Sequence, residues 1–386
     1  MHQELVGFAQ DIYQTKGFIP LHAPSFIGNE KQYVENCIKS TFVSSVGRYV
    51  DEFELLLEQY TKSKKVIAVV NGTAALHTAL YMVGVGRDDL VLTQALSFVA
   101  TCNAIHHMGA QPVFIDVSLS GLGMCPQALK KYLEENGKFD DRGYCIHKKT
   151  GQYFKAVLPV HTFGHPVELD KLQTVCNYWN ISLVEDAAES LGSFYKGRHT
   201  GTYGDFSAIS FNGNKIITTG GGGAVLCQDE ALAAKTKHLT TTAKVTHPWE
   251  YYHDLAGFNY RMPNLNAALG CAQMEFLSTY VHKKRFLASQ YCQFFDNSDL
   301  QFVLEPQNAI SNYWLNAVIC NDLESRDKLL KATNEQGVMT RPVWHLMHQL
   351  PMYNKCFRGC LKNSEWLADR LVNIPSSVPE PGVVDA

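Results

Sequence analysis

The sequence predicts an α/β protein, in which a large domain with a mostly parallel sheet flanked by helices precedes a smaller α+β domain. Three observations support this class. Continuous apolar runs rich in β-branched residues, such as 66–70, are typical of strands buried on both faces. Over residues 66–186 such runs alternate with segments of helical periodicity, which indicates βαβ units. Beyond residue 300 the alternation gives way to a mixed pattern of strands and helices.

The expected elements follow from this pattern in chain order. Two helices come first, over 30–40 and 49–60, because apolar residues recur there at helical spacing. The strands of the large sheet are expected at 66–70, 90–95, 112–117, 156–161, 182–186, 206–211 and 224–227. The helices after them are expected at 74–83, 100–108, 126–136, 169–179 and 229–239. A long helix from Asn264 towards Phe295, with a break near Ser278, precedes strands over 313–319 and 338–343 and helices over 325–337 and 365–372.

This order divides the chain into four parts. An N-terminal arm over 1–30, with Pro20 and Pro24, is expected to be extended. The large domain spans 31–260, the long helix and the small C-terminal domain span 261–378, and a disordered tail spans 379–386.

Composition excludes several classes of protein. The 386 residues are 46% hydrophobic and 18% charged, which is typical of a soluble globular protein. The net charge of −3 provides no basic surface for a nucleic acid, and no apolar run is long enough to span a bilayer. The N-terminal residues lack the pattern of a secretion signal, and the eleven scattered cysteines suit a reducing compartment. We therefore expect a cytoplasmic protein.

The stretch from Asp205 to Gly223 carries the most distinctive chemistry. An apolar run ends in Asn212-Gly-Asn, a strong turn signal, and is followed by Lys215 and then by four glycines. A lysine fixed at such a turn can form a Schiff base with an aldehyde cofactor. A solvated lysine in a flexible turn is the alternative. The residues at the other strand ends are needed to distinguish the two interpretations.

Ligands of open α/β sheets bind outside the carboxyl ends of the strands, where two further features lie. Asn71-Gly-Thr-Ala74 leads from a strand directly into a helix, whose N-terminus offers N–H donors to a phosphate; ordinary helix capping is the alternative. Glu185 and Asp186 end another apolar strand, where a buried carboxylate needs a cation. A protonated pyridine nitrogen, a metal or an arginine would serve.

A metal is the poorer choice, because no cluster of histidine, cysteine and acidic residues with ligand spacing surrounds Asp186. The pairs His161 and His165, and His345 and His348, lack the HExxH pattern, so we interpret them as substrate or core histidines.

Phe98, which follows another strand, can cover a planar ring, although it can equally be a core residue. Together with Lys215, Asp186, the helix start at Gly72 and the hydroxyl of Ser210, it provides an amine, a carboxylate, phosphate donors and a stacking ring. Pyridoxal 5'-phosphate requires all four of these groups. The chain has neither the GxxxxGK[ST] motif nor GxGxxG, which disfavours nucleotide-binding alternatives.

These motifs resemble the DegT/StrS family of nucleotide-sugar aminotransferases, which are fold-type I pyridoxal phosphate enzymes. The resemblance extends over residues 17–375 and rests on Asn71-Gly-Thr-Ala74, Ser97-Phe-Val-Ala-Thr101, Glu185-Asp-Ala-Ala188, Ser210-Phe…Lys215, Gly220-Gly-Gly-Gly-Ala224 and Gly257-Phe-Asn-Tyr-Arg261. Further segments are similar to the LegC-like subgroup: Thr41-Phe-Val-Ser-Ser-Val-Gly47, His161-Thr-Phe-Gly-His-Pro166, Asn212-Gly-Asn-Lys215 and His238-Leu-Thr-Thr-Thr-Ala-Lys244.

The resemblance implies a role for each matching residue. Lys215 would form the Schiff base and move the proton, and Asp186 would pair with the pyridinium nitrogen. The phosphate would be held by Gly72, Thr73, Ala74 and Ser210, with Phe98 stacked on the ring. Asn259 would reach the cofactor of a neighbouring subunit, which implies a homodimer with shared active sites. Glu189 stands where many relatives carry glutamine or histidine, near the cofactor's phenolic oxygen.

The function implied is amination of a nucleotide-linked 4-keto-6-deoxy sugar, in particular UDP-4-keto-6-deoxy-N-acetylglucosamine, with L-glutamate as donor, for bacterial surface glycans. Polar residues expected at the nucleotide sugar are Ser44, Ser45, His161, His165 and Lys244. Two alternatives stay open, namely a 3-keto-sugar aminotransferase and a non-catalytic pyridoxal phosphate-binding regulator on the same fold. The related sugar 3-dehydratases carry histidine at the position of Lys215 and are disfavoured.

Overall fold

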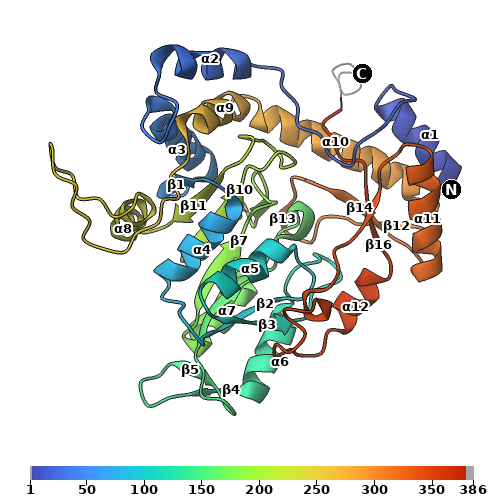
Figure 1. Cartoon of the computed structure of the whole chain (residues 1–386). Helices are drawn as coiled ribbons and strands as arrows, with labels where there is room; N and C mark the ends of the chain where they lie inside the picture. Colours follow the sequence, from blue (N-terminus) through green and yellow to red (C-terminus); the bar gives the residue numbers. More distant parts are fainter. Residues whose placement is uncertain (1, 380–386) are drawn as a thin grey trace.

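The computed structural model describes residues 2–379, and a seven-stranded sheet forms its centre (Figure 1). The strand order is β1-β11-β10-β7-β6-β2-β3, and every strand except β11 runs in the same direction. The strands are β1 (Lys65–Val69), β2 (Leu90–Gln94), β3 (Gln111–Ile115), β6 (Phe154–Leu158), β7 (Ser182–Asp186), β10 (Phe206–Ser210) and β11 (Gly223–Cys227). The expected mostly parallel sheet is confirmed.

Helices cover both faces of this sheet because alternate strand residues point to opposite sides. In β1, Val66 and Ala68 join one core cluster, whereas Ile67 and Val69 join another on the opposite face. One face packs against α4 (Gly72–Met82), α5 (Val99–His107) and α8 (Glu230–Thr240). The other packs against α2 (Glu30–Ser40), α3 (Arg48–Thr61), α6 (Pro126–Asn136), α7 (Leu169–Trp179) and α9 (Asn264–Met274).

A second, four-stranded antiparallel sheet lies in the C-terminal part and has the order β12-β14-β16-β15. Its strands are β12 (Gln301–Phe302), β14 (Asn316–Ile319), β15 (Arg341–Pro342) and β16 (Leu371–Ile374). Around it lie α10 (Leu277–Phe295), α11 (Leu323–Glu335), α12 (Lys362–Ala368) and the short 3₁₀ helix η2 (Met347–Gln349). The long helix is interrupted between α9 and α10, close to the expected break.

Smaller elements complete the described chain. A hairpin pairs β4 with β5, and a three-stranded sheet has the order β13-β8-β9. Their bounds are β4 (Gly137–Phe139), β5 (Cys145–His147), β8 (Phe194–Tyr195), β9 (Arg198–His199) and β13 (Ala309–Ile310), with a 3₁₀ helix η1 (Thr162–Gly164). No helix among residues 2–379 is long and apolar enough to cross a membrane.

Two expectations about local structure are wrong. The N-terminal arm does not begin extended, because its first residues form α1 (His2–Ile12), which buries Leu5, Val6, Ala9 and Ile12. This apolar spacing is typical of an amphipathic helix, and α1 packs against α11. The helix expected over 365–372 ends at Ala368, because Leu371 and Val372 pair with β14 in the small sheet. The expected tail lies outside the described residues from position 380 onwards.

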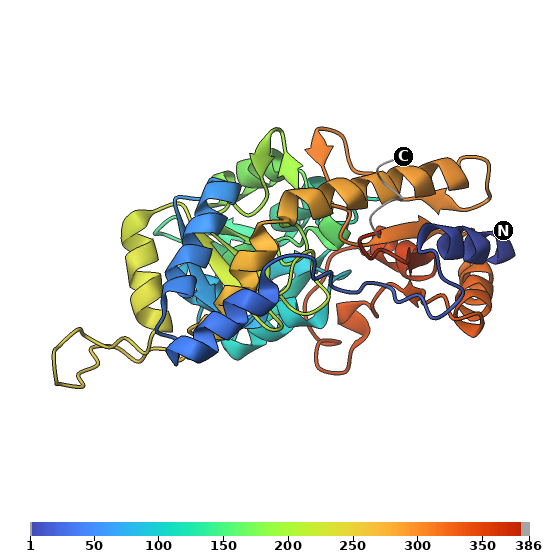
Figure 2. The same ribbon diagram turned by 90° about the horizontal axis from the view of Figure 1, so that it is seen from above.

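The segment 241–259 extends away from the rest of the chain in both views (Figures 1 and 2). Two antiparallel backbone bridges, from Thr241 to Asn259 and from Lys244 to His253, hold its base together. Its outer part exposes large side chains, with Trp249 76% and Tyr251 83% accessible. Exposed aromatic rings are therefore concentrated on this projecting segment.

Candidate active site

A cavity of about 350 Å³ opens at the carboxyl ends of β7 and β10, next to the N-terminal ends of α4 and α5. This is the location at which parallel α/β sheets bind ligands. Most of the residues expected at a cofactor line it, namely Gly72, Thr73, Phe98, Asp186, Glu189, Ser210 and Lys215. The cavity also contains residues from the C-terminal part, Trp314 and Trp344.

Lys215 is held at the cavity by a turn and by two neighbouring side chains. Its backbone N–H donates to the carbonyl of Asn212, which closes the expected turn. Its Nζ lies 3.4 Å from Oε1 of Glu189 and 3.9 Å from the ring centre of Trp314. A cation over an indole face is favourable, and the indole also covers the amine from one side. The side chain is 12% exposed, so Lys215 is a fixed group rather than a solvated one.

Asp186 is buried at the end of β7 and accepts two hydrogen bonds. The hydroxyl of Thr101 donates to Oδ2 over 2.7 Å, and the N–H of Ala188 donates to Oδ1 over 3.2 Å. Burial raises the pKa of Asp186, while these hydrogen bonds and the charge of Lys215 lower it in part. A buried carboxylate in this position strongly favours a cationic partner.

Glu189 is a second buried carboxyl group at the cavity, 5% exposed. The N–H of Phe163 donates to its Oε2 over 2.8 Å, and Oε1 faces Lys215. Burial raises the pKa of Glu189, although the charge of Lys215 opposes this rise. The cavity therefore contains two buried carboxyl groups and one amine, an arrangement suited to holding and moving a proton.

The N-terminus of α4 and Ser210 form one side of the cavity. Gly72 is required there, because a Cβ at this position would lie 2.9 Å from Cβ of Ser210. Asn71 caps the helix by accepting the N–H of Ala74 over 2.8 Å, so this N–H, expected at a phosphate, is already bonded. The hydroxyls of Thr73 and Ser210 and the positive end of the helix dipole are suited to a dianion.

Phe98 precedes α5 and is 51% exposed, which contradicts its alternative interpretation as a core residue. Its ring lies 6.1 Å from the ring of Trp344, and both residues line the cavity. An exposed aromatic face beside a buried carboxylate suits a planar, charged ring.

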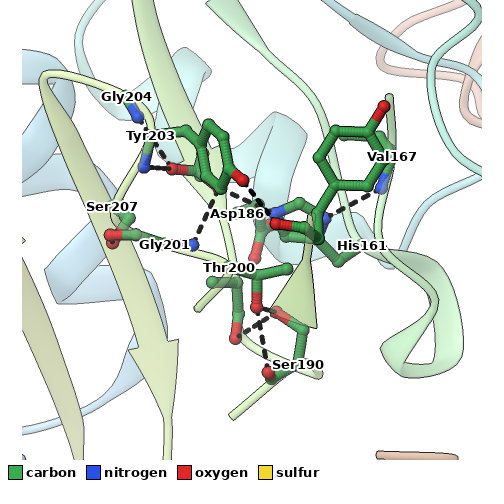
Figure 3. Close-up of polar contacts among 12 residues, drawn as sticks. His161, Val167, Asp186, Ser190, Thr200, Gly201, Tyr203, Gly204 and Ser207 are labelled. Atoms are coloured by element: carbon green, nitrogen blue, oxygen red, sulfur yellow. Dashed lines mark hydrogen bonds and ion pairs between the residues drawn. The ribbon is translucent and has the colours of Figure 1, made fainter. Parts of the chain in front are cut away.

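Glu185, the residue before Asp186, is fully buried and faces away from the cavity. Its carboxylate accepts the N–H groups of Gly201, Tyr203 and Gly204 over 2.7, 2.7 and 2.8 Å (Figure 3). Burial alone would raise the pKa of Glu185, but the hydrogen bond from His161 and those from the backbone keep it below its ordinary value. This carboxylate thus stabilises the loop between β9 and β10.

The substrate residues expected at His161 and His165 are fully buried and do not line the cavity. Nδ1 of His161 accepts the N–H of Val167 over 3.2 Å, so Nε2 carries the proton and donates to Glu185 over 3.0 Å (Figure 3). Burial lowers the pKa of His165 to about 4, so this ring is neutral near pH 7. Hydrogen bonds account for His161, whereas both ring nitrogens of the buried His165 lack a hydrogen-bond partner within residues 2–379, and we carry neither histidine into the proposed site.

The other expected residues lie elsewhere on the chain. Ser44 is exposed and Ser45 half-buried on the loop before α3, and neither lines the cavity. Lys244 and Asn259 are exposed on the projecting segment 241–259. Their roles, including contact with a neighbouring subunit, stay predictions.

Three residues at the cavity were not predicted individually. Thr101 orients Asp186 across 85 positions of sequence, and Nε1 of Trp314 donates to the carbonyl of Asn214 over 2.6 Å across 100 positions. Trp344, which follows β15 of the small sheet, also lines the cavity. Contacts between such distant residues leave no local pattern, although Thr101 does belong to a motif recognised by resemblance.

We predict that Glu185→Gln lowers the free energy of unfolding by at least about 2 kcal/mol. The amide of glutamine has one oxygen and cannot replace both carboxylate oxygens, so N–H groups of the loop lose their acceptor. Because the pKa of Glu185 is lowered on folding, its stabilisation is present above its ordinary value of 4.5 and is lost as the pH falls through the lowered value. Chemical denaturation as a function of pH measures both effects. Glu168→Gln, which removes an exposed pair with Lys171, is the control and should cost less than about 1 kcal/mol. Equal stability of the two variants would contradict the role given to Glu185.

Comparison with known proteins agrees with this geometry. The model of the DegT/DnrJ/EryC1/StrS aminotransferase family matches residues 24–379. A GDP-perosamine synthase of Escherichia coli O157:H7 is 34% identical over 359 residues, which cover 93% of each chain. The aminotransferase TlmJ of Streptoalloteichus hindustanus superposes with a TM-score of 0.82 at 26% identity, covering 92% of this chain and 93% of TlmJ. Spr1654 of Streptococcus pneumoniae in its PLP form shares the fold, with a TM-score of 0.84 at 22% identity over 95% of this chain and 96% of its own.

A family match over nearly the whole chain and a relative above 30% identity establish the relationship. The described residues contain no group of three or more histidine, cysteine or acidic side chains arranged to hold a metal ion. The chain belongs to the DegT/DnrJ/EryC1/StrS aminotransferase family, and is a pyridoxal phosphate-dependent sugar aminotransferase.

Proposed function

We propose that this enzyme transfers the amino group of L-glutamate to C4 of a nucleotide-linked 4-keto-6-deoxy sugar, UDP-4-keto-6-deoxy-N-acetylglucosamine. The observation that carries the proposal is the amine of Lys215 enclosed with Asp186 and Glu189 in one cavity. The similarity to the LegC-like subgroup supports the UDP-linked sugar. GDP-perosamine synthases, at 33% to 34% identity, favour a GDP-linked sugar as the second candidate.

The residues of the cavity fit pyridoxal phosphate. Thr73, Ser210 and the N-terminus of α4 would hold its phosphate, and Phe98 would cover its ring. Asp186, a buried carboxylate that lines the cavity, would pair with the ring nitrogen. When bound, pyridoxal phosphate supplies an aldehyde that carries the amino group and a ring that accepts the electron pair freed at the donor's Cα.

The side chains then have distinct tasks. Lys215 takes a proton from the donor's Cα and returns one to the sugar carbon that receives nitrogen. Glu189 holds the amine of Lys215 in place and can store a proton for it, because its raised pKa brings its titration closer to neutrality. Trp314 covers Lys215 and excludes water from one side.

We propose further that two copies of the chain assemble with shared active sites in the cytoplasm. The projecting segment 241–259 carries exposed Trp249, Tyr251 and Tyr252, which a second copy would cover. Asn259, at the base of this segment, would reach the neighbouring cofactor. The eleven cysteines are free thiols, in keeping with a reducing compartment.

We predict that the purified enzyme aminates a C4-keto UDP-sugar and leaves the C3-keto isomer unchanged, with L-glutamate as donor. Product analysis by mass spectrometry and NMR measures the position of the new amine. Lys215→Ala is the negative control and should lose at least about 10³-fold in rate, since no other amine of the described residues lines the cavity. Amination at C3 alone would refute the proposal, whereas amination of the GDP-linked sugar alone would favour the second candidate.

We predict a pH-dependent stability difference between the cofactor-free wild type and Glu189→Gln. Because burial raises the pKa of Glu189 above its ordinary 4.5, the folded chain holds this proton more tightly than the unfolded chain. The wild type should therefore lose stability relative to the variant as the pH rises from 4.5 through the raised value. The glutamine side chain of the variant retains an acceptor for the N–H of Phe163. Chemical denaturation between pH 4 and about 8 measures the difference, and a difference that is constant with pH would contradict the raised pKa.

We predict that mixing two inactive variants restores activity if subunits share their sites. In a hybrid of Lys215→Ala and Asn259→Ala, one site carries both defects and the other carries none. Random hybrids at equal amounts should recover about a quarter of the wild-type rate, because half the dimers are hybrids and half of their sites are intact. Co-expression with two affinity tags followed by a rate assay measures this recovery. Absence of recovery in purified hybrids would show that Asn259 acts within its own chain, whereas full activity of the Asn259→Ala homodimer would show that Asn259 has no part in the site.

A further inference from the structure

A second, larger cleft of about 840 Å³ adjoins the catalytic cavity. The two share Asn214, Trp314 and Trp344 as lining residues, so they communicate across the two tryptophans. The remaining lining comes mainly from the small sheet and the helices next to it, which Figure 1 places on the far side of the molecule from α4. A ligand longer than the catalytic cavity would therefore extend into this cleft.

The small sheet contributes a pair of hydrogen-bond donors to the cleft. Arg341 on β15 and Asn373 on β16 are directly opposed cross-strand partners, so their side chains project from the same face of the sheet. Both line the cleft. Nδ2 of Asn373 is buried without a hydrogen-bond partner, although the residue is only 4% exposed. An unsatisfied buried amide donor on a residue that lines a cleft calls for an acceptor, which a ligand can provide.

Arg341 is an exposed residue of the edge strand and forms no ion pair within residues 2–379. Arg326, which also lines the cleft, differs because its guanidinium is bonded to Asp327 and to the carbonyl of Ala368. Two acidic residues also line the cleft, namely Glu365, which lies 3.6 Å from His348, and Asp369. Arg341 is thus the cation left available for an anionic ligand.

Trp344 forms the wall between the two spaces. Its ring packs 5.2 Å from Phe163 and 6.1 Å from Phe98, and the residue is half-buried. Trp314, the other shared aromatic residue, carries Lys215 on its face. A ligand that passes between the spaces would therefore bring one end to Lys215 and the other to Arg341.

We propose that the cleft binds the diphosphate of the nucleotide sugar, with Arg341 and Asn373 donating hydrogen bonds to phosphate oxygens. A guanidinium and an amide side by side match the spacing of neighbouring anionic oxygens. The sugar then reaches Lys215 past Trp314 and Trp344. This assignment rests on the proposed function and names the part of the chain that would recognise the nucleotide. The carboxylates of the amino donor share the same anionic chemistry, so the test must separate the two ligands.

The test measures dissociation constants of UDP, GDP and 2-oxoglutarate for the holoenzyme by isothermal titration calorimetry. Arg341→Ala should weaken binding of the preferred nucleoside diphosphate roughly tenfold or more, and Arg341→Lys should restore part of it. Asn373→Ala should weaken it by a smaller factor. Arg87→Ala, which changes an exposed arginine that lines neither space, is the matched control and should bind like the wild type. Affinity for 2-oxoglutarate should stay within about twofold in all four variants.

Three results would overturn the assignment. Unchanged nucleotide affinity in Arg341→Ala would place the diphosphate elsewhere. Variants that lose only 2-oxoglutarate binding would show that Arg341 and Asn373 bind a carboxylate instead. Absence of any UDP or GDP binding to the wild type would also refute it. Because binding requires no turnover, an enzyme that binds a nucleotide through Arg341 but does not aminate a C4-keto sugar would refute only the proposed function.

Discussion

The site depends on two adjacent carboxylates buried at the end of one strand. Because successive strand residues point to opposite faces, Glu185 and Asp186 face different surroundings although they are neighbours in sequence. Glu185 accepts three backbone N–H groups and His161, and so fixes the loop that precedes β10. Asp186 faces the cavity with two hydrogen bonds, which leave capacity for a cation. The first carboxylate anchors the loop, and only the second faces the cavity.

Trp314 connects the two parts of the fold at the amine of Lys215. It precedes β14 of the small sheet, yet its indole N–H is bonded to the turn that carries Lys215, and its ring covers Nζ. A displacement of the small sheet relative to the large sheet would therefore move the environment of Lys215. The same residue borders the cleft that contains Arg341. Occupation of that cleft and the position of the amine are thus linked through one side chain.

The sequence predicted the large sheet, and the bounds of α6 and α7, because buried strands and amphipathic helices leave strong local patterns. It also indicated Lys215 and Asp186, since turns and strand ends mark where a ligand site forms, whereas Glu189 was singled out only through the family resemblance. Thr101, Trp314 and Trp344 were not singled out, because their contacts cross from 85 to 100 positions or more of sequence. His161 and His165 were interpreted as substrate or core residues, and the structure buries both away from the cavity. A histidine near a strand end can equally be bonded inside the core, and spacing does not distinguish the two.

On the roles proposed above, the division of the fold would also separate catalysis from recognition. Lys215, Asp186 and Glu189 lie at the end of the large sheet or on the turns that follow its strands, where a parallel architecture fixes their distances. Arg341 and Asn373 lie on a small antiparallel sheet, and Arg341 is on its edge strand, where a side chain can change without disturbing a parallel core. UDP and GDP share the diphosphate, so contacts from Arg341 and Asn373 would hold either nucleotide, and a preference for one base would come from other residues. Such an arrangement allows one transamination site to serve sugars that differ in the nucleotide they carry, because the groups that move the proton and those that hold the phosphates do not share a strand.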